Sequence, residues 1–248
     1  MNDFKLPFRG IGFAGPWGVG KTLACLDLMV IAKAAGVPTD RLLVIDTHGS
    51  VEPYLMLEPY KDAFTYEIAL SQKELIDVLK KYKLMNKDRQ EKMFLTTMDT
   101  AEMLQDTKVE EVWNDPSLTD SYKEKMTGFM WGRVKKNLLS DVLEMFVRLT
   151  NHMLFTIHTR KEFVGNKPSG REESKFLAPI MQLCQAVGIM SRRINIKLPD
   201  VNFFPPMGKS QFLGMPPTIM EFTWPKFFSY VGKHPVDWNK LKKEEMVT

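Results

Sequence analysis

The stretch GFAGPWGVGKTLACLDLM, residues 12–29, decides the fold expected for this chain. A glycine-rich turn stands there between an apolar, strand-like segment and a helical run. Residues 15–22 match the P-loop pattern G-x-x-x-x-G-K-[ST] in full. A chance Lys-Thr pair after a glycine turn would not also require a strand before it and a helix after it. The stretch therefore predicts a phosphate-binding turn in an α/β fold.

Each residue type in this turn has a chemical reason. Glycines let the backbone adopt positive φ and approach a phosphate, and successive main-chain N–H groups can then form an anion nest. Lys21 would supply a cation for the β- and γ-phosphates, and Thr22 a hydroxyl for Mg²⁺. Trp17 suits a stacking contact with a base or partner, and equally a plain surface anchor. The residues expected to contact nucleotide are Gly15, Pro16, Trp17, Gly18, Val19, Gly20, Lys21, Thr22 and Leu23.

Composition limits the class of protein. The 248 residues are 44% hydrophobic, enough for one substantial core with a small appendage. The net charge of +4 is too small to indicate a nucleic-acid binder. Cys25 and Cys184 lie in apolar segments and read as buried free thiols. Without a secretory signal or a spanning apolar run, we expect a soluble cytoplasmic protein (host cytoplasm if viral) with no membrane partner.

Strand-like and helix-like segments alternate along the chain. Strands are expected at residues 10–15, 41–46, 63–70, 92–99, 152–159 and 192–198, and helices at 21–35, from Ser71 onward, at 134–149 and at 176–190. Ser71 and Glu74 have the spacing of a capping box. Residues 101–132 read as a polar excursion and 160–174 as a charged loop. This order predicts a mostly parallel twisted sheet with helices on both faces. A core over residues 1–200 would carry a small, proline-rich and β-rich extension, residues 201–248, packed on it.

Two carboxylates follow strands that could end beside the glycine-rich turn. Asp46 ends one apolar run and Asp99 ends another. Ligands of open α/β sheets bind at the carboxyl ends of the strands, so both are candidate magnesium ligands together with Thr22. Asp99 is also compatible with a simple capping role for the next segment.

The order of these motifs resembles the RecA-like P-loop ATPases, and more narrowly the phage-type RecA-core nucleotide-binding proteins of single-strand annealing and recombination. The resemblance covers about residues 8–200, and only the P-loop is highly specific. It implies a Mg²⁺-dependent ATP hydrolase that acts on single-stranded DNA and self-associates into a ring or filament. It also implies that Asp99 is the Walker B acid and that His158 takes the place of the γ-phosphate sensor. His158 is compatible with a structural role as well.

The same resemblance suggests where basic residues would act. It gives a DNA-contacting role to residues 160–174. Phe163 in that segment is a stacking candidate, and Phe203-Phe204 are another, although buried packing suits this pair better. The resemblance also gives a role in trans, at a neighbour's nucleotide, to a later basic group. A solvated loop and the charges of an edge strand explain these residues equally well. The DNA-binding candidates are Arg160, Lys161, Lys167 and Arg171, and the trans-acting candidates are Arg192, Arg193 and Lys197.

One departure from the family concerns catalysis. The RecA-like pattern has a water-activating glutamate two residues after the second strand's aspartate, and here that position is His48. A histidine can act as a general base, and Glu52 lies close enough in sequence to substitute. Slow hydrolysis, with nucleotide as a conformational clamp, is a third possibility. Two other functions stay open: a nucleotide-gated assembly or packaging accessory protein, and a small nucleotide kinase.

Overall fold

The computed structural model describes residues 4–102, 114, 116–124, 142–164, 167–174, 178–204 and 216–231. Its strands are β1 (Gly10–Gly15), β2 (Leu42–Asp46), β3 (Thr65–Ile68), β4 (Met93–Asp99), β5 (Thr150–Val164), β6 (Lys167–Ser174), β7 (Ala186–Ser191), β8 (Asp200–Phe204) and β9 (Thr218–Ile219). Its helices are α1 (Lys21–Ala34), α2 (Gln72–Arg89), α4 (Asp120–Glu124), α6 (Glu144–Leu149), α7 (Ala178–Leu183) and α8 (Trp224–Val231), with short 3-10 turns at Thr39–Arg41 and Glu52–Tyr54.

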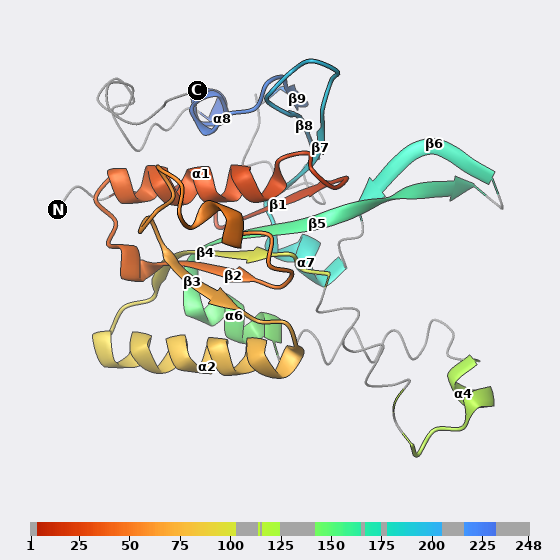
Figure 1. The fold of residues 1–248 in the computed structure, drawn as a ribbon, viewed down its shortest axis with the longest axis horizontal. Coiled ribbons are helices and arrows are strands. Elements are labelled where there is room, and N and C mark those ends of the chain that lie inside the picture. Colours follow the sequence, from red (N-terminus) through yellow and green to blue (C-terminus); the bar gives the residue numbers. More distant parts are fainter. Residues whose placement is uncertain are drawn as a thin grey trace.

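One sheet joins these strands in the order β3-β2-β4-β5-β1-β7-β8-β9, and β6 pairs with β5 (Figure 1). Pairing is parallel from β3 to β7 and antiparallel at β8 and β9. The strand that leads into the glycine-rich turn, β1, is separated by β5 from the strand that ends in Asp99, β4. This arrangement confirms the predicted mostly parallel α/β sheet.

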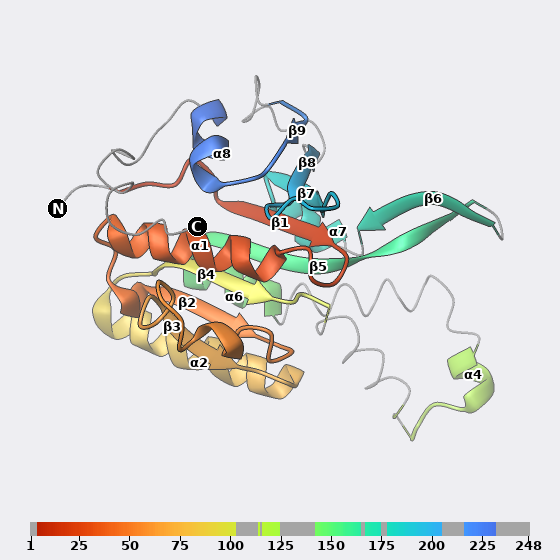
Figure 2. The ribbon, with the colours of Figure 1, turned by 45° about the horizontal axis from the view of Figure 1, so that its top comes forward.

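Helices cover both faces of the sheet, as predicted. In Figures 1 and 2, α1 and α8 lie on one face, and α2 and α6 lie on the other. The core of the α1 face is rich in aromatic rings, and Phe13 of β1 packs edge-to-face on Phe203, Phe222 and Trp224. The α2 face is more aliphatic and also holds Ile180 of α7. The sheet is therefore buried on both sides, which explains why β1 and the residues of β2 before Asp46 read as continuous apolar runs.

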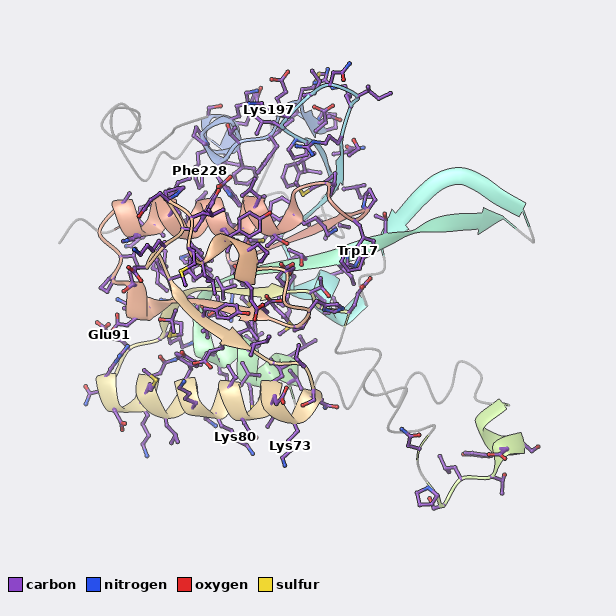
Figure 3. The ribbon with its side chains drawn as sticks, in the orientation of Figure 1. Trp17, Lys73, Lys80, Glu91, Lys197 and Phe228 are labelled. Atoms are coloured by element: carbon purple, nitrogen blue, oxygen red, sulfur yellow. The ribbon has the colours of Figure 1, made fainter. Side chains whose placement is uncertain are left out.

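The predicted start of α2 is confirmed in detail. The Ser71 hydroxyl accepts a hydrogen bond from the Glu74 N–H at 3.2 Å, and the Glu74 carboxylate accepts one from the Ser71 N–H at 3.0 Å. Lys73 and Lys80 point away from the sheet on the outer side of this helix (Figure 3). Its inner side buries Leu75 among the core residues.

The segment after β8 packs on the core. The Trp224 indole Nε1 donates a hydrogen bond to the Ala24 carbonyl of α1 at 2.6 Å, so α8 is tied to the helix that follows the glycine-rich turn. β8 itself lies in the main sheet and spans the boundary expected at residue 200. The phenylalanine pair considered for DNA stacking begins here, and Phe203 is a buried core residue.

Three secondary-structure predictions were wrong. Residues 176–190 are not one helix, because α7 ends at Leu183 and β7 then pairs with β1. Residues 192–198 form a turn instead of a strand; Asn195 has φ 66° and the Ile196 N–H bonds the Arg193 carbonyl. The charged segment 160–174 is the outer half of an antiparallel β5–β6 ribbon. A dipeptide of the hairpin-turn type, Gly-Asn at 165–166, separates these strands in the sequence.

Two further predictions are only partly tested. Of the helix expected over 134–149, the structure describes residues from 142 onward, including α6. Of the excursion at 101–132, it describes residues 101–102, 114 and 116–124, including α4, and the remainder lies outside the described residues. The proline-rich end contains β9, as expected, and also the eight-residue helix α8, which was not predicted. Cys25 and Cys184 are free and buried, as expected.

Two buried hydroxyls on β4 make a stability test possible. Among the described residues, Thr96 Oγ1 and Thr97 Oγ1 have no hydrogen-bond partner. A buried polar group without a partner costs about 1–3 kcal/mol, so each single change, Thr96→Val or Thr97→Val, should raise the free energy of unfolding by about 1 kcal/mol. Thr150→Val is the matched control: that hydroxyl bonds the Met93 and His152 carbonyls, so its loss should lower stability. Chemical denaturation measures all three, and a loss of stability in both β4 variants would contradict the prediction.

Candidate nucleotide-binding site

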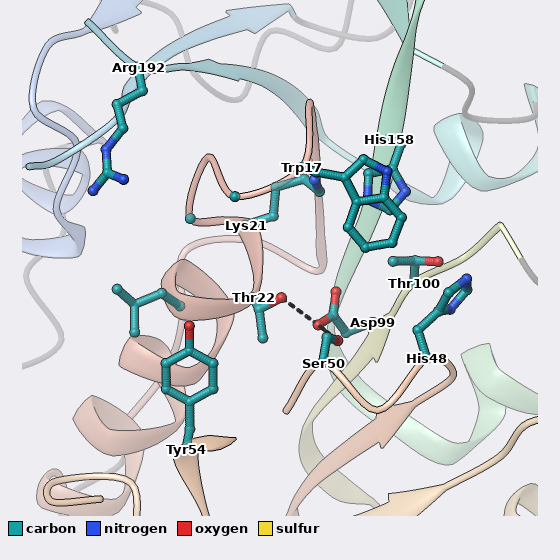
Figure 4. Close-up of a pocket in the computed structure, with 13 residues that line it drawn as sticks. Trp17, Lys21, Thr22, His48, Ser50, Tyr54, Asp99, Thr100, His158 and Arg192 are labelled. Carbon is teal, nitrogen blue, oxygen red and sulfur yellow. Dashed lines mark hydrogen bonds between the residues drawn. The ribbon is translucent and has the colours of Figure 1, made fainter. Parts of the chain in front are cut away.

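A cavity of about 290 Å³ opens where β1, β4 and β5 end and α1 begins (Figure 4). Its position at the carboxyl ends of parallel strands is where ligands of open α/β sheets bind. The lining residues are Trp17, Gly18, Gly20, Lys21, Thr22, Leu23, His48, Ser50, Tyr54, Asp99, Thr100, His158 and Arg192.

The glycine-rich turn presents the bare start of α1 to this cavity. Gly20 caps the helix with φ 105°, a conformation that disfavours any side chain, and no side chain bonds the first N–H groups. The first turn also carries no acidic residue. The turn is pressed against the sheet, since a Cβ on Gly15 would lie 2.8 Å from the Met190 carbonyl oxygen. The positive end of the α1 dipole is therefore available to bind an anion.

Lys21 lies folded back on its own loop. Its Nζ donates hydrogen bonds to the Gly15 and Pro16 carbonyl oxygens, each at 2.9 Å. Burial lowers the pKa of this ammonium group, and the nearby carboxylates of Asp99 and Glu102 oppose that shift. The side chain is a buried cation held between neutral carbonyls, and a phosphate oxygen would be a stronger partner for it.

The Asp99 carboxylate is the centre of the polar contacts in the cavity. It is 1% exposed and accepts hydrogen bonds from the hydroxyls of Thr22 at 2.6 Å and Ser50 at 2.9 Å. A third hydroxyl, that of Thr156 on β5, donates to its other oxygen. Asp99 thus faces the glycine-rich turn from across the cavity.

Magnesium chemistry fits this group of oxygens. Mg²⁺ prefers hard oxygen ligands and commonly takes one or two carboxylates together with phosphates and water. Thr22 Oγ1 and Asp99 converge in that way, and the described residues contain no cluster of three or more His, Cys, Asp or Glu that would form an all-protein cage. Thr22 would hold the ion directly, with Asp99 orienting its water shell.

Asp46, the other predicted magnesium ligand, makes its contacts with the loop that follows β2. Its oxygens accept hydrogen bonds from the backbone N–H groups of His48, Ser50 and Val51, at 3.0, 3.2 and 2.8 Å. The Tyr66 hydroxyl adds a fourth bond. Asp46 is fully buried and does not line the cavity, so it shapes the loop after β2 and is not placed as a magnesium ligand.

The two candidate water-activating groups lie differently. His48 lines the cavity and is exposed, and its Nδ1 is 2.8 Å from the Thr47 hydroxyl. Glu52 is exposed in the turn Glu52–Tyr54 and is not among the lining residues. Of the two, only His48 is positioned to meet a bound nucleotide.

His158 lies within β5, at the last position of the β1–β5 register, opposite Gly15. Its imidazole is buried and pairs with Glu102, with Nδ1 2.7 Å from Oε2. One face of the ring stacks on Trp17, at 3.9 Å between ring centroids. The exposed tryptophan of the glycine-rich turn therefore covers a buried histidine–carboxylate pair.

The basic candidates separate into three groups. Arg192 lines the cavity of its own chain, held by the Lys197 carbonyl, so its position does not require a neighbouring subunit. Arg193 pairs with Asp200 at 2.7 Å, and Lys197 is exposed in the turn. For Arg160, Lys161, Lys167 and Arg171 the structure describes the backbone of the β5–β6 ribbon, and their side chains lie outside the described residues. The same holds for Phe163 and Phe204.

Several residues of the site were missed in the sequence. Ser50, Tyr54 and Thr100 line the cavity, Thr156 holds Asp99 and Glu102 holds His158. Thr156 and His158 are two residues apart at the end of one strand, so strand alternation could have placed both on the same face. Nothing in the sequence pairs Glu102 with His158, because that contact depends on the β4–β5 neighbourhood.

The Tyr54 wall of the cavity depends on a partly buried acid of α1, Asp27. Tyr54 packs edge-to-face on Tyr60, whose hydroxyl donates to Asp27 Oδ1 at 2.8 Å. Burial raises the pKa of Asp27 from 3.8 to about 6, partly opposed by the bond from Tyr60. A raised carboxyl pKa means that folding favours the protonated form.

The sign of this shift gives a pH test. The contribution of Asp27 to stability is complete below about pH 3.8 and is lost as the pH rises through about 6. The neutral variant Asp27→Asn should therefore gain stability relative to the native chain between pH 4 and 7, by up to about 3 kcal/mol. Urea titrations at several pH values measure the difference. The exposed acid Asp40, changed to Asn, is the control, and a pH-independent difference for Asp27→Asn would contradict the prediction.

Among the described residues, no helix is both long and apolar enough to span a bilayer. No family model and no curated protein matches the sequence. Among solved structures, the chain is similar to one titled "Crystal structure of the RadB recombinase", at 12% sequence identity and a TM-score of 0.49. That alignment covers 81% of this chain and 82% of the other. At this identity the likeness transfers no residue roles, and the roles described here come from the contacts themselves.

Proposed function

We propose that the chain binds ATP with Mg²⁺ in this cavity and hydrolyses it, as a RecA-like P-loop ATPase. The carrying observation is the contact of Thr22 with Asp99 at 2.6 Å, directly beside a buried lysine and an uncapped helix start. Together these groups supply amides, a cation, a hydroxyl and a carboxylate for a magnesium–triphosphate. The turn from Gly15 to Leu23 encloses the phosphates in this proposal.

Binding of Mg²⁺ and ATP would replace the present hydrogen-bond partners of these groups by more strongly charged ones. Lys21 would leave the Gly15 and Pro16 carbonyls for phosphate oxygens, and the first amides of α1 would gain acceptors. Thr22 would turn its hydroxyl from Asp99 to the metal. Each exchange replaces a neutral or local contact by a charge-assisted one.

Single-stranded DNA is the proposed partner, in phage-type recombination, annealing or repair. The β5–β6 ribbon extends past the edge of the sheet (Figure 2), and its pairing begins at Thr159, the residue after His158. Its sequence includes Arg160, Lys161, Lys167 and Arg171, whose charge suits a phosphate backbone. Arg193 and Lys197 stay candidates for contact with a neighbouring subunit of a ring or filament.

A second function has one observation in its favour. The position where the family has a water-activating glutamate holds an exposed histidine, and Glu52 lies off the cavity. Both features suit a nucleotide-gated assembly or packaging accessory protein that binds ATP with little turnover. Tight ATP binding without hydrolysis, unchanged by single-stranded DNA, would favour it.

Removal of the P-loop cation tests nucleotide binding. Lys21→Ala should weaken ATP binding by at least about 100-fold, because a buried charge-assisted contact with phosphate is lost, while the melting temperature stays near that of the native chain. Lys33→Ala, an exposed lysine in the last turn of the same helix, is the control and should bind normally. Calorimetric titration with ATP and Mg²⁺ measures both, and undiminished affinity in Lys21→Ala would refute the site.

Turnover and salt dependence test the DNA partner. We expect single-stranded DNA to stimulate ATP hydrolysis. Changing the four ribbon residues Arg160, Lys161, Lys167 and Arg171 to Gln should abolish the stimulation and flatten the slope of log affinity against log salt by up to about 3, at about 0.7 per phosphate contact. The same number of changes to Gln on the outer side of α2, at Lys73, Lys80, Lys83 and Lys87, is the charge-matched control. An equal slope in both variants would remove the ribbon from the proposal.

A further inference from the structure

Glu102 is a buried acid that the proposed phosphate and magnesium contacts do not use. It follows β4 by three residues and is 8% exposed. Its carboxylate approaches two nitrogens of one residue: Oε1 accepts from the His158 backbone N–H at 3.2 Å, and Oε2 lies 2.7 Å from His158 Nδ1. Because the carboxylate contacts both the backbone N–H and the ring of the same histidine, it restricts the orientation of that ring.

The geometry also sets the proton on the ring. A carboxylate oxygen and an unprotonated ring nitrogen are both acceptors, so a contact of 2.7 Å requires a proton between them. Because Glu102 already accepts the backbone N–H, its ionised form with a proton on His158 Nδ1 satisfies both contacts. The carboxylate therefore holds the Nδ1–H form of the imidazole and directs the Nε2 edge away from itself.

The third member of the group is Trp17. Its indole lies over the His158 ring, with an interplanar angle of 25°, while 73% of its own surface is exposed. Trp17 belongs to the loop that would enclose the phosphates, and His158 belongs to the strand that supplies Thr156 to Asp99. The stack thus places Trp17 of the P-loop against His158 of β5.

We infer that Glu102 is a positioning residue that holds His158 in its Nδ1–H form beneath Trp17, so that the cavity distinguishes a nucleoside triphosphate from a diphosphate. The inference rests on the proposed ATP site. A terminal phosphate at the strand ends would lie near His158 and Asp99, whereas a diphosphate would be held mainly by the loop and α1. Among the described residues, the other charged or titratable groups that line this cavity are Asp99 from β4, Lys21 from α1, His48 and Tyr54 from the segment after β2, and Arg192 from the turn after β7.

The first experiment determines which ring nitrogen of His158 carries the proton, in the absence of nucleotide. ¹⁵N NMR of the four histidines, at a pH where the rings are neutral, should show His158 in the Nδ1–H form in the native chain. Glu102→Gln should keep that form, because its amide oxygen still accepts, and Glu102→Leu should lose it. His152, whose Nδ1 contacts the Phe8 carbonyl, is an internal reference that should not change.

The second experiment compares the affinities for a triphosphate analogue and for a diphosphate. In Glu102→Leu the affinity for AMP-PNP with Mg²⁺ should fall by about ten-fold, as expected for a lost charge-assisted contact, while the affinity for ADP should stay within about two-fold. Glu102→Gln should retain the greater part of the native discrimination. Glu67→Leu is the matched control: that glutamate accepts the Tyr82 hydroxyl at 2.7 Å on β3, away from the cavity. It should alter neither affinity.

Two results would overturn the inference. One is a His158 ring that keeps the Nδ1–H form in Glu102→Leu. The other is an equal loss of AMP-PNP and ADP affinity in a variant that is still folded by circular dichroism. Should Glu102→Leu not fold, Glu102→Gln decides: loss of the Nδ1–H form there contradicts the role given to Glu102. A native chain that binds neither nucleotide refutes the proposed function and the nucleotide role, whereas the NMR result still decides separately whether Glu102 positions His158.

Discussion

The Asp99 carboxylate is the contact on which the site depends. Hydroxyls from α1, from the loop after β2 and from β5 all bond this one buried group, which itself ends β4. A buried carboxylate is costly unless its oxygens are satisfied, so the three segments are held together at the edge of the sheet. The start of α1, whose amides have no side-chain cap, is thereby fixed opposite this carboxylate. The cavity therefore combines a helix N-terminus, which favours anions, with a carboxylate, which is a suitable ligand for a hard cation.

The parts of this site that could be predicted from the sequence are local ones. The turn from Gly15 to Thr22 follows from glycine spacing, and the acids Asp46 and Asp99 end continuous apolar runs that only buried parallel strands explain. What Asp46 does could not be predicted. Its oxygens are used by three amides of the loop that follows it, and that use depends on the conformation of the loop.

The wrong predictions have one feature in common, which is that the presence or absence of a neighbouring strand overrode the local pattern. Residues 186–191 are apolar enough for a helix, yet they form the strand that completes the sheet beside β1. Gly188 permits this, since a Cβ there would lie 2.5 Å from the Val201 side chain on β8. Within the described part of the chain, the alternating residues 192–198 pair with no strand and turn back instead. This turn leaves Ile194 91% exposed and brings Arg192 to the cavity of its own chain.

A structure of the chain with Mg²⁺ and AMP-PNP tests the central claim most directly. The account predicts that Lys21 Nζ leaves the Gly15 and Pro16 carbonyls for phosphate oxygens, that Thr22 Oγ1 ligates the metal, and that Asp99 lies one water molecule away from it. Lys21 still bonded to its own loop, or a metal bound away from Thr22 and Asp99, would contradict the account.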